Sequence, residues 1–172
     1  MSAAKAVIAI NINTLQEAAI PIMLEPIGTV RGGRVEAEDD DWGAVEAQLA
    51  LDPACVSPDS TLGLADYSHV TVLFHMHKVA PDAVERGARH PRERRDWPKV
   101  GIFAQPARAR PNRIGVTTCE LVAVDGLTLR VRGLDAIDGT PVIDIKPCIT
   151  GFAPRAPVRE PAWVKELMAT YW

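Results

Sequence analysis

The strongest constraint on the fold is the stretch 68–79, in which the side chains alternate with a period of two. This spacing matches a β-strand, whose successive side chains point to opposite faces of a sheet. We therefore predict a strand with one apolar face toward the core. That face carries Val70, Val72, Phe74 and Met76, and the other carries His69, Thr71, Leu73, His75 and His77.

Shorter segments with strand character lie on both sides of this one. The pair Asp125-Gly126 separates two of them and suits a type I′ hairpin turn. Because no long helical segment lies between the strands, they indicate a mainly β fold with antiparallel pairing, either a barrel or a sandwich. The further predicted strands are 23–31, 44–52, 100–103, 114–124, 127–131 and 141–145.

The remaining segments carry weaker signals. Residues 1–23 predict an N-terminal extension, with a β-compatible run at 7–12 and a more helical one at 15–19. Residues 81–98, rich in charge, Pro and Gly, predict a long mobile loop. In the tail 151–172, Pro161 starts a predicted short helix whose Trp163, Leu167 and Tyr171 recur every four residues. This stripe either packs in a core or contacts a dimer partner or substrate.

Composition fits a single globular domain, since 172 residues with 47% hydrophobic and 24% charged side chains supply a core. No apolar run reaches the roughly 18–20 residues that span a bilayer, and the start lacks a signal-peptide cleavage pattern. Three widely spaced cysteines, Cys55, Cys119 and Cys148, fit neither a disulfide framework nor a CxxC metal site. We expect a cytoplasmic protein with reduced, packed thiols and no membrane partner.

The net charge of −3 hides an uneven distribution. An acidic run occupies 36–41, whereas 86–113 contains nine of the 19 basic residues. Such a basic block either solvates a loop or meets a polyanion, so it is a candidate surface for nucleic acid.

Nucleotide and hydrolase motifs of the GxGxxG, P-loop and GxSxG types are missing from the sequence. His75 and His77, two apart on the predicted strand, either hold a metal, act as hydrogen-bonded structural residues or contact a ligand. The sequence identifies no third ligand, and we predict no metal.

Two further stretches concentrate polar side chains. Residues 108–115, RARPNRIG, suit a carboxylate, a phosphate or an adenine edge, or else form a solvated turn. Residues 133–147, GLDAIDGTPVIDIKP, contain a natural turn at 138–141, and Asp144 and Lys146 share a strand face suited to an ion pair.

At these stretches the sequence resembles the TsaA-like family, also called YaeB/TrmO-like. The family signatures stand here as GIFAQPARARPNRIG (101–115) and GLDAIDGTPVIDIKPC (133–148). The opening PIG-x-V corresponds to 26–30, and the S-H-hydrophobic-F-H strand to 68–75. The resemblance covers about 24–150, which we take as the cofactor-binding domain.

The resemblance implies a small antiparallel β-barrel with long loops that binds S-adenosyl-L-methionine. It also implies a homodimer with the cofactor near the interface, and methylation of N6 of threonylcarbamoyl-adenosine beside the tRNA anticodon. The basic segment 86–113 would contact this tRNA. Cofactor-binding residues carried over by motif are Phe74, His75, Arg110, Asn112, Val116, Gly133, Leu134, Asp135 and Asp138. If the acceptor nitrogen needs a base, His75 or Asp138 is the catalytic candidate.

This chain departs from the family pattern at two places. The early P-R-Q cofactor contact is missing, and Asp41, Trp42 and Gly43 stand near its position. The A-T-R-S segment has become 104–107, AQPA, so its arginine is lost and Arg108 is the candidate replacement. Two alternatives therefore stay open: a β-barrel methyltransferase of a small molecule, and a cofactor-binding regulator or RNA module without turnover.

Overall fold

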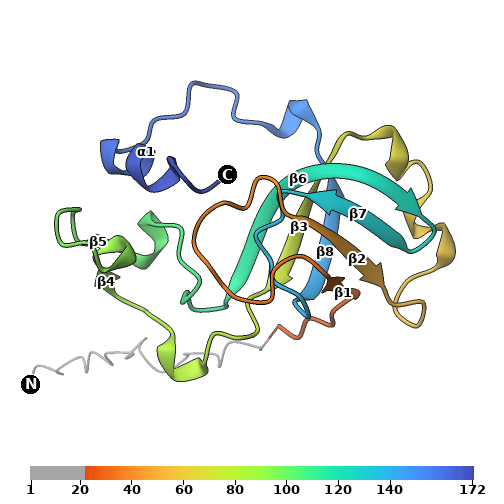
Figure 1. Ribbon diagram of the computed structural model, residues 1–172, viewed down its shortest axis with the longest axis horizontal. Coiled ribbons are helices and arrows are strands. Elements are labelled where there is room, and N and C mark those ends of the chain that lie inside the picture. The colour runs from red at the N-terminus through yellow and green to blue at the C-terminus, as the bar shows by residue number, and fades with distance from the viewer. Residues whose placement is uncertain (1–21) are drawn as a thin grey trace, which may run out of the picture.

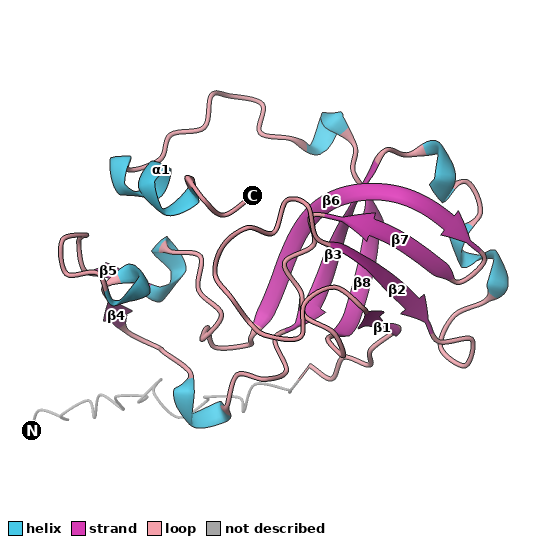
Figure 2. Cartoon of the chain, in the orientation of Figure 1, coloured by secondary structure: helices cyan, strands magenta, loops and turns pink. Residues whose placement is uncertain are grey.

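The computed structural model describes residues 22–172, and its centre is a closed antiparallel barrel. Around the barrel the strands follow the order β1-β2-β7-β6-β3-β8. Figures 1 and 2 show these strands gathered on one side of the molecule, with β4, β5 and α1 on the other. The barrel strands are β1 (Gly28–Arg31), β2 (Glu46–Leu51), β3 (His69–His75), β6 (Ile114–Asp125), β7 (Thr128–Arg132) and β8 (Pro141–Pro147). The predicted mainly β class and the barrel are confirmed.

The barrel interior is filled by the apolar half of each alternating strand. Val70, Val72 and Phe74 of β3 are buried, as the period of two predicted, and their neighbours in the strand are more exposed. Aliphatic side chains from the other strands meet them inside, and burying each such side chain contributes about 1.5–3 kcal/mol. The fully enclosed ones include Val30, Leu49, Leu129, Val131 and Val142.

The contact between β1 and β8 closes the barrel and is short. Only Gly28 and Thr29 of β1 pair with β8, opposite Val142 and Pro141. On its other side Gly28 lies so close to β2 that an added Cβ would be 2.5 Å from the Ala50 carbonyl oxygen. The predicted strand over 23–31 is therefore limited to Gly28–Arg31.

Two strand details differ from the sequence prediction or add to it. The β6–β7 turn consists of Gly126 and Leu127, because Asp125 still pairs with Thr128. Of the turn residues only Gly126 has a positive φ, 55°, so the predicted type I′ turn at Asp125-Gly126 is wrong. A β-bulge in the β3–β8 pairing lies next to Phe74, and bulges often change where neighbouring side chains point.

Outside the barrel, the chain forms a second, smaller cluster. Short strands β4 (Ala88–Arg89) and β5 (Val100–Gly101) pair, and the helix α1 (Ala162–Met168) packs close by through Trp163 and Leu167. Trp97 lies between them and donates from its indole nitrogen to Glu166 at 2.9 Å. Residues 81–98 were predicted as a loop, but a buried tryptophan and a strand pair organise them. Core packing is thus the role of Trp163 and Leu167.

Several 3₁₀ turns connect these elements. They are Pro58–Thr61, Leu64–Asp66, Pro81–Ala83, Pro91–Glu93, Ile102–Ala104 and Thr150–Phe152. Pro161 precedes α1 as its N-cap and does not occupy its first turn. The predicted N-terminal elements at 7–12 and 15–19 lie outside the described residues. Within residues 22–172, no helix combines the length and apolar character needed to cross a membrane.

The three cysteines occupy two kinds of environment. Cys55 and Cys148 are exposed, which corrects the prediction that all three pack inside, and Cys119 is buried in the barrel. Burial raises the pKa of the Cys119 thiol to about 12, helped by the nearby Asp135 carboxylate. Since the thiolate is the reactive form, we expect a disulfide dye to label two thiols in the native protein and the third only after unfolding. The control is the Cys119→Ser variant, which lacks the buried thiol. In its native state it should react with the dye as rapidly and to the same extent as the native chain.

Candidate functional site

A cavity of about 890 Å³ opens between one end of the barrel and the segments outside it. Its floor comes from the end of β3, the start of β6 and the turn before β8. Its walls come from 36–42, 76–93 and 106–110, with Leu167 and Tyr171 closing one side. The two stretches singled out in the sequence, around Arg110 and around Asp135, therefore face one shared space.

The floor is built on a close approach between Phe74 and Gly115. These residues are opposite each other in the β3–β6 pairing. A Cβ on Gly115 would lie 2.3 Å from two atoms of the Phe74 ring, so only glycine leaves room for the ring in this position. Phe74 is 2% exposed, while Val116, on the neighbouring position of β6, is largely exposed. Together they give the cavity an apolar base.

Asp135 is the carboxylate that the barrel contributes to this cavity. The Thr117 hydroxyl donates to its Oδ1, and the Tyr171 hydroxyl donates to its Oδ2. Burial, and next the Asp135 charge, raise the pKa of Tyr171, so the phenol stays protonated and remains a donor. Two donors on separate elements therefore fix the orientation of Asp135, and each oxygen keeps a further lone pair for a ligand.

The chain end that carries Tyr171 is also attached to the loop after β1. Asp41 and Trp42 donate their backbone N–H groups to the carbonyls of Thr170 and Tyr171, both at 2.8 Å. The Trp42 side chain is 3% exposed and lies under the Arg34 guanidinium, 4.7 Å from the ring centroid. This loop therefore forms a wall of the cavity with a defined shape.

Part of the basic segment is neutralised by the acidic run. Arg92 donates to both oxygens of Asp40, at 3.0 and 2.7 Å, and this pairing lowers the pKa of Asp40. Arg108 donates to the Ala37 carbonyl at 2.9 Å and lies 3.8 Å from Asp39. The acidic and basic stretches that the sequence set apart are thus partners across one wall of the cavity.

Two other guanidinium groups of the lining have a different environment. Arg110 is half-buried beside the cavity. Arg89, at the end of β4, also lines it, and its Nε is buried without a hydrogen-bond partner among residues 22–172. Sequence reasoning missed Arg89, because in a segment with nine basic residues nothing but the fold marks this one.

The histidine pair separates at the end of β3. His77 lines the cavity, whereas His75 does not, because it follows the buried Phe74 and points to the other face of the strand. Burial lowers the pKa of His75, and the charges of Arg113 and His77 lower it further. In the part of the chain that the structure describes, no three His, Cys, Asp or Glu side chains are grouped to hold a metal ion.

Comparison with known proteins places this fold and cavity in a family. The model of the tRNA-methyltransferase O N-terminal domain matches residues 39–159. The chain belongs to the tRNA-methyltransferase O family. A probable S-adenosyl-L-methionine-binding protein of Pyrococcus abyssi is 34% identical over 145 residues, which cover 81% of this chain and 76% of that protein.

Other members of the family are similar over shorter shares of their length. A human tRNA (adenine(37)-N6)-methyltransferase is 38% identical over 102 residues, 59% of this chain and 23% of that protein. A crystal structure of TrmO from Pseudomonas aeruginosa matches with a TM-score of 0.66 and 28% identity, covering 83% of this chain. The chain spans 63% of the chain in that crystal structure.

The residues predicted from the tRNA-methyltransferase O resemblance divide into two sets. Some line the cavity: Trp42, Phe74, Arg108, Arg110, Val116 and Asp135. Others lie outside its lining: Asp41, Gly43, His75, Asn112, Gly133, Leu134 and Asp138. Of these, Asp138 accepts from the Gly32 amide at 2.8 Å, Leu134 is packed in the core, and Gly43 abuts Trp172.

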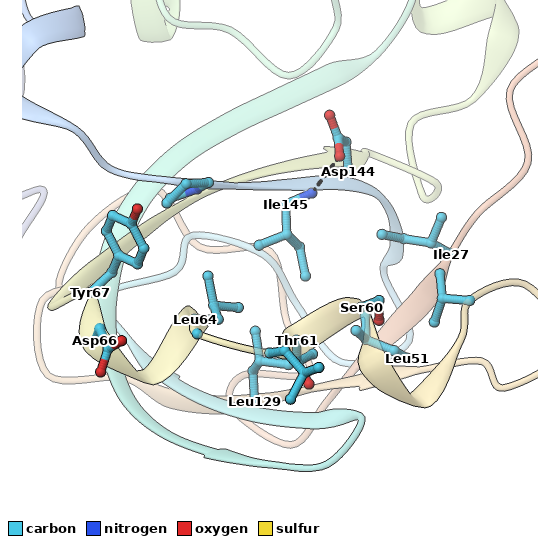
Figure 3. A pocket seen from close by; sticks show the side chains of 14 residues that line it. Ile27, Leu51, Ser60, Thr61, Leu64, Asp66, Tyr67, Leu129, Asp144 and Ile145 are labelled. Carbon is cyan, nitrogen blue, oxygen red and sulfur yellow. Dashed lines mark hydrogen bonds between the residues drawn. The ribbon is translucent and has the colours of Figure 1, made fainter.

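A second cavity, of about 720 Å³, lies elsewhere on the barrel (Figure 3). Apolar residues such as Ile27, Leu51, Leu64 and Ile145 line it, and its charged lining residues are Asp66 and Asp144. Asp144 accepts from the Ile145 amide and pairs with Lys146, at 2.9 and 2.6 Å, and the second contact is the predicted ion pair. With two carboxylates and no cation in its lining, this cavity does not suit a nucleotide.

Proposed function

We propose that this protein binds S-adenosyl-L-methionine in the cavity around Asp135 and transfers its methyl group to N6 of an adenine in tRNA. The acceptor proposed is threonylcarbamoyl-adenosine beside the anticodon. Family membership and the names of the relatives support the cofactor and the class of acceptor. The structural observation that carries the proposal is the meeting of both signature stretches at one cavity.

The residues of the cavity fit this cofactor chemically. The cofactor combines an adenine, a ribose, a cationic sulfonium and an amino-acid carboxylate. Phe74, Val116 and Ile137 supply apolar surface, and Asp135 supplies an oriented carboxylate for hydroxyls or for positive charge. The Nε of Arg89, buried without a hydrogen-bond partner among residues 22–172, is a donor suited to an anionic group.

In the proposed reaction the cofactor supplies an electrophilic methyl group. The protein has to hold the acceptor nitrogen in line with this methyl and keep the geometry fixed. The Phe74–Gly115 floor and the doubly held Asp135 serve that purpose. His75 and Asp138 stay the predicted bases. The lowered pKa of His75 favours its neutral form, which can accept a proton, but neither residue lines the cavity, whereas His77 does.

Direct assay of the reaction tests the proposal. Purified protein is incubated with methyl-labelled cofactor and with tRNA that either carries or lacks the threonylcarbamoyl group, followed by mass analysis of the nucleosides. We expect one added methyl on the modified adenosine only. Cofactor binding without methyl transfer to any tRNA would favour a small-molecule acceptor or a binding module. Absence of cofactor binding would overturn the proposal itself.

Three exposed cations of the basic segment are proposed to contact tRNA phosphates. Arg86, Arg95 and Lys99 are exposed, and no ion pair of the described chain involves them. Replacing all three with glutamine is expected to lower the salt slope of tRNA binding by about 2–3, because each phosphate contact adds about 0.7–0.9. Titrations at several salt concentrations measure this slope. Unchanged cofactor affinity is the control, and an unchanged slope contradicts this contact surface.

We further infer that the protein is cytoplasmic and forms a homodimer. Within each chain, the functional domain is inferred to span about 24–150. Large apolar side chains exposed on the described chain, Phe103 at 79% and Phe152 at 86%, support a protein contact of this kind. Sedimentation of the purified protein with and without cofactor tests the dimer, and a monomer under both conditions contradicts it.

A further inference from the structure

Arg89 has an unusual environment for an arginine. It ends the two-residue strand β4, half-buried, with β5 and Gln105 beside it. Its Nε is enclosed and, within residues 22–172, finds no acceptor. A buried donor without an acceptor is costly, because the group loses its water and gains nothing in return. Such a group often has a functional reason, and here the side chain lines the proposed cofactor cavity.

Three of the other four Lys and Arg side chains that line the cavity have partners within residues 22–172, and Arg110 is the fourth. Arg92 is held by Asp40, Arg108 by Ala37 and Asp39, and the Lys78 ammonium donates to the Val35 carbonyl at 3.2 Å. These groups neutralise or support the wall in which they lie. The Nε of Arg89, by contrast, is buried without an acceptor among these residues, although the Arg89 charge helps to lower the pKa of Glu85.

The neighbouring sequence supports a role for Arg89 in binding a ligand in the cavity. Pro106 also lines the cavity, and it stands where the sequence signature has an arginine. Proline carries neither charge nor donor. Gln105 fixes the local geometry instead, since its side-chain amide donates to the Arg89 carbonyl at 3.4 Å and to the Val100 carbonyl at 3.1 Å. A guanidinium is thus supplied to the cavity from β4 rather than from the 104–107 segment.

We propose that Arg89 binds the carboxylate of the amino-acid part of the cofactor, through its Nε and a terminal nitrogen after a small side-chain movement. This assignment rests on the proposed function. The carboxylate is the one anionic group of the cofactor, and a guanidinium matches it with two parallel hydrogen bonds. Asp135 then faces the cationic and hydroxyl-bearing parts of the same molecule. Opposite charges in the cavity would fix the direction in which the cofactor lies.

The test compares two ligands that differ only in this carboxylate: S-adenosylmethionine and its decarboxylated form. Calorimetry with Arg89→Gln is expected to show about 10- to 100-fold weaker binding of S-adenosylmethionine, the usual range for a hydrogen bond to a charged group. Binding of the decarboxylated ligand should be the same in both proteins. Equal losses for both ligands, or no loss for either, overturn the assignment.

Further variants separate this role from structural and RNA-binding ones. Arg86→Gln, a change of the same type on an exposed neighbour outside the cavity, should leave both affinities unchanged. Arg89→Met removes an unpaired buried donor, so its melting temperature without ligand should equal or exceed that of the native chain. A large drop would show a structural role and contradict the assignment. If Arg89→Gln weakens only tRNA binding, the guanidinium contacts phosphate and the carboxylate assignment is wrong.

Failure of this assignment is distinguishable from failure of the proposed function. If the native protein binds no S-adenosylmethionine, the function itself is contradicted. If it binds and methylates normally but Arg89→Gln binds both ligands like the native chain, the function stands and only the role of Arg89 falls.

Discussion

Replacing Gly115 with alanine is expected to weaken cofactor binding on the order of 100-fold, the effect of an ångström-scale displacement in a site of fixed geometry. The added methyl would lie 2.3 Å from the Cε2 and Cζ atoms of Phe74. Because β3 and β6 are paired at this position, separating their backbones would break hydrogen bonds of the sheet. The Phe74 ring therefore has to move out of the floor of the cavity. Calorimetry with S-adenosylmethionine measures the loss.

This substitution should also lower the free energy of unfolding, by about 1–3 kcal/mol, the range for overpacking. Gly101→Ala is the matched control, since a Cβ there meets no atom within 4 Å and its φ of −60° suits any residue. Native affinity in Gly115→Ala together with a shifted Phe74 ring would show that the ring is not part of the binding floor.

The second large effect is expected for Asp135→Asn, with about 10- to 100-fold weaker cofactor binding. An amide has one acceptor oxygen where the carboxylate has two, so the hydroxyl of Thr117 or of Tyr171 loses its acceptor. The negative charge facing the cavity is lost as well. Asp144→Asn, in the other cavity, removes a carboxylate of similar exposure class and should leave cofactor binding unchanged.

Titration of tyrosine absorbance gives an independent reading of the same contact. Burial and the adjacent Asp135 charge both raise the pKa of Tyr171. Removing the charge leaves the burial, so the pKa of Tyr171 should fall in Asp135→Asn but stay above its ordinary value. The chain contains only one other tyrosine, Tyr67. An unchanged Tyr171 titration would show that the two side chains do not interact in solution.

The barrel was predictable because its strands carry their burial pattern in the sequence. The alternation around Val70, Val72 and Phe74 survives in the structure residue by residue. Strand ends were less predictable, since the register of β1 depends on partners far away in the sequence, and its pairing with β8 involves only two residues. The hairpin turn moved by one residue for the same reason, because the pairing of Asp125 with Thr128 decided it.

The candidate site was predictable only in part. Motif resemblance identified Phe74, Arg110 and Asp135, which line one cavity. It could not identify Tyr171, since a hydrogen bond across 36 positions depends on how the chain end folds back. Nor could charge patterning show that Arg92 and Arg108 are bound by the acidic run, which only tertiary structure brings opposite them.

The cavity draws its floor and its walls from different kinds of structure. Phe74 and Gly115 lie on paired strands of the barrel, and Phe74 packs in the core against side chains of several strands. A replacement there disturbs these neighbours. Most of the wall residues belong to segments that connect the strands, and such segments generally tolerate substitution better than a barrel core. Substitutions in the wall segments, such as the proline at position 106, therefore alter the shape of the opening while the Phe74–Gly115 floor keeps its geometry.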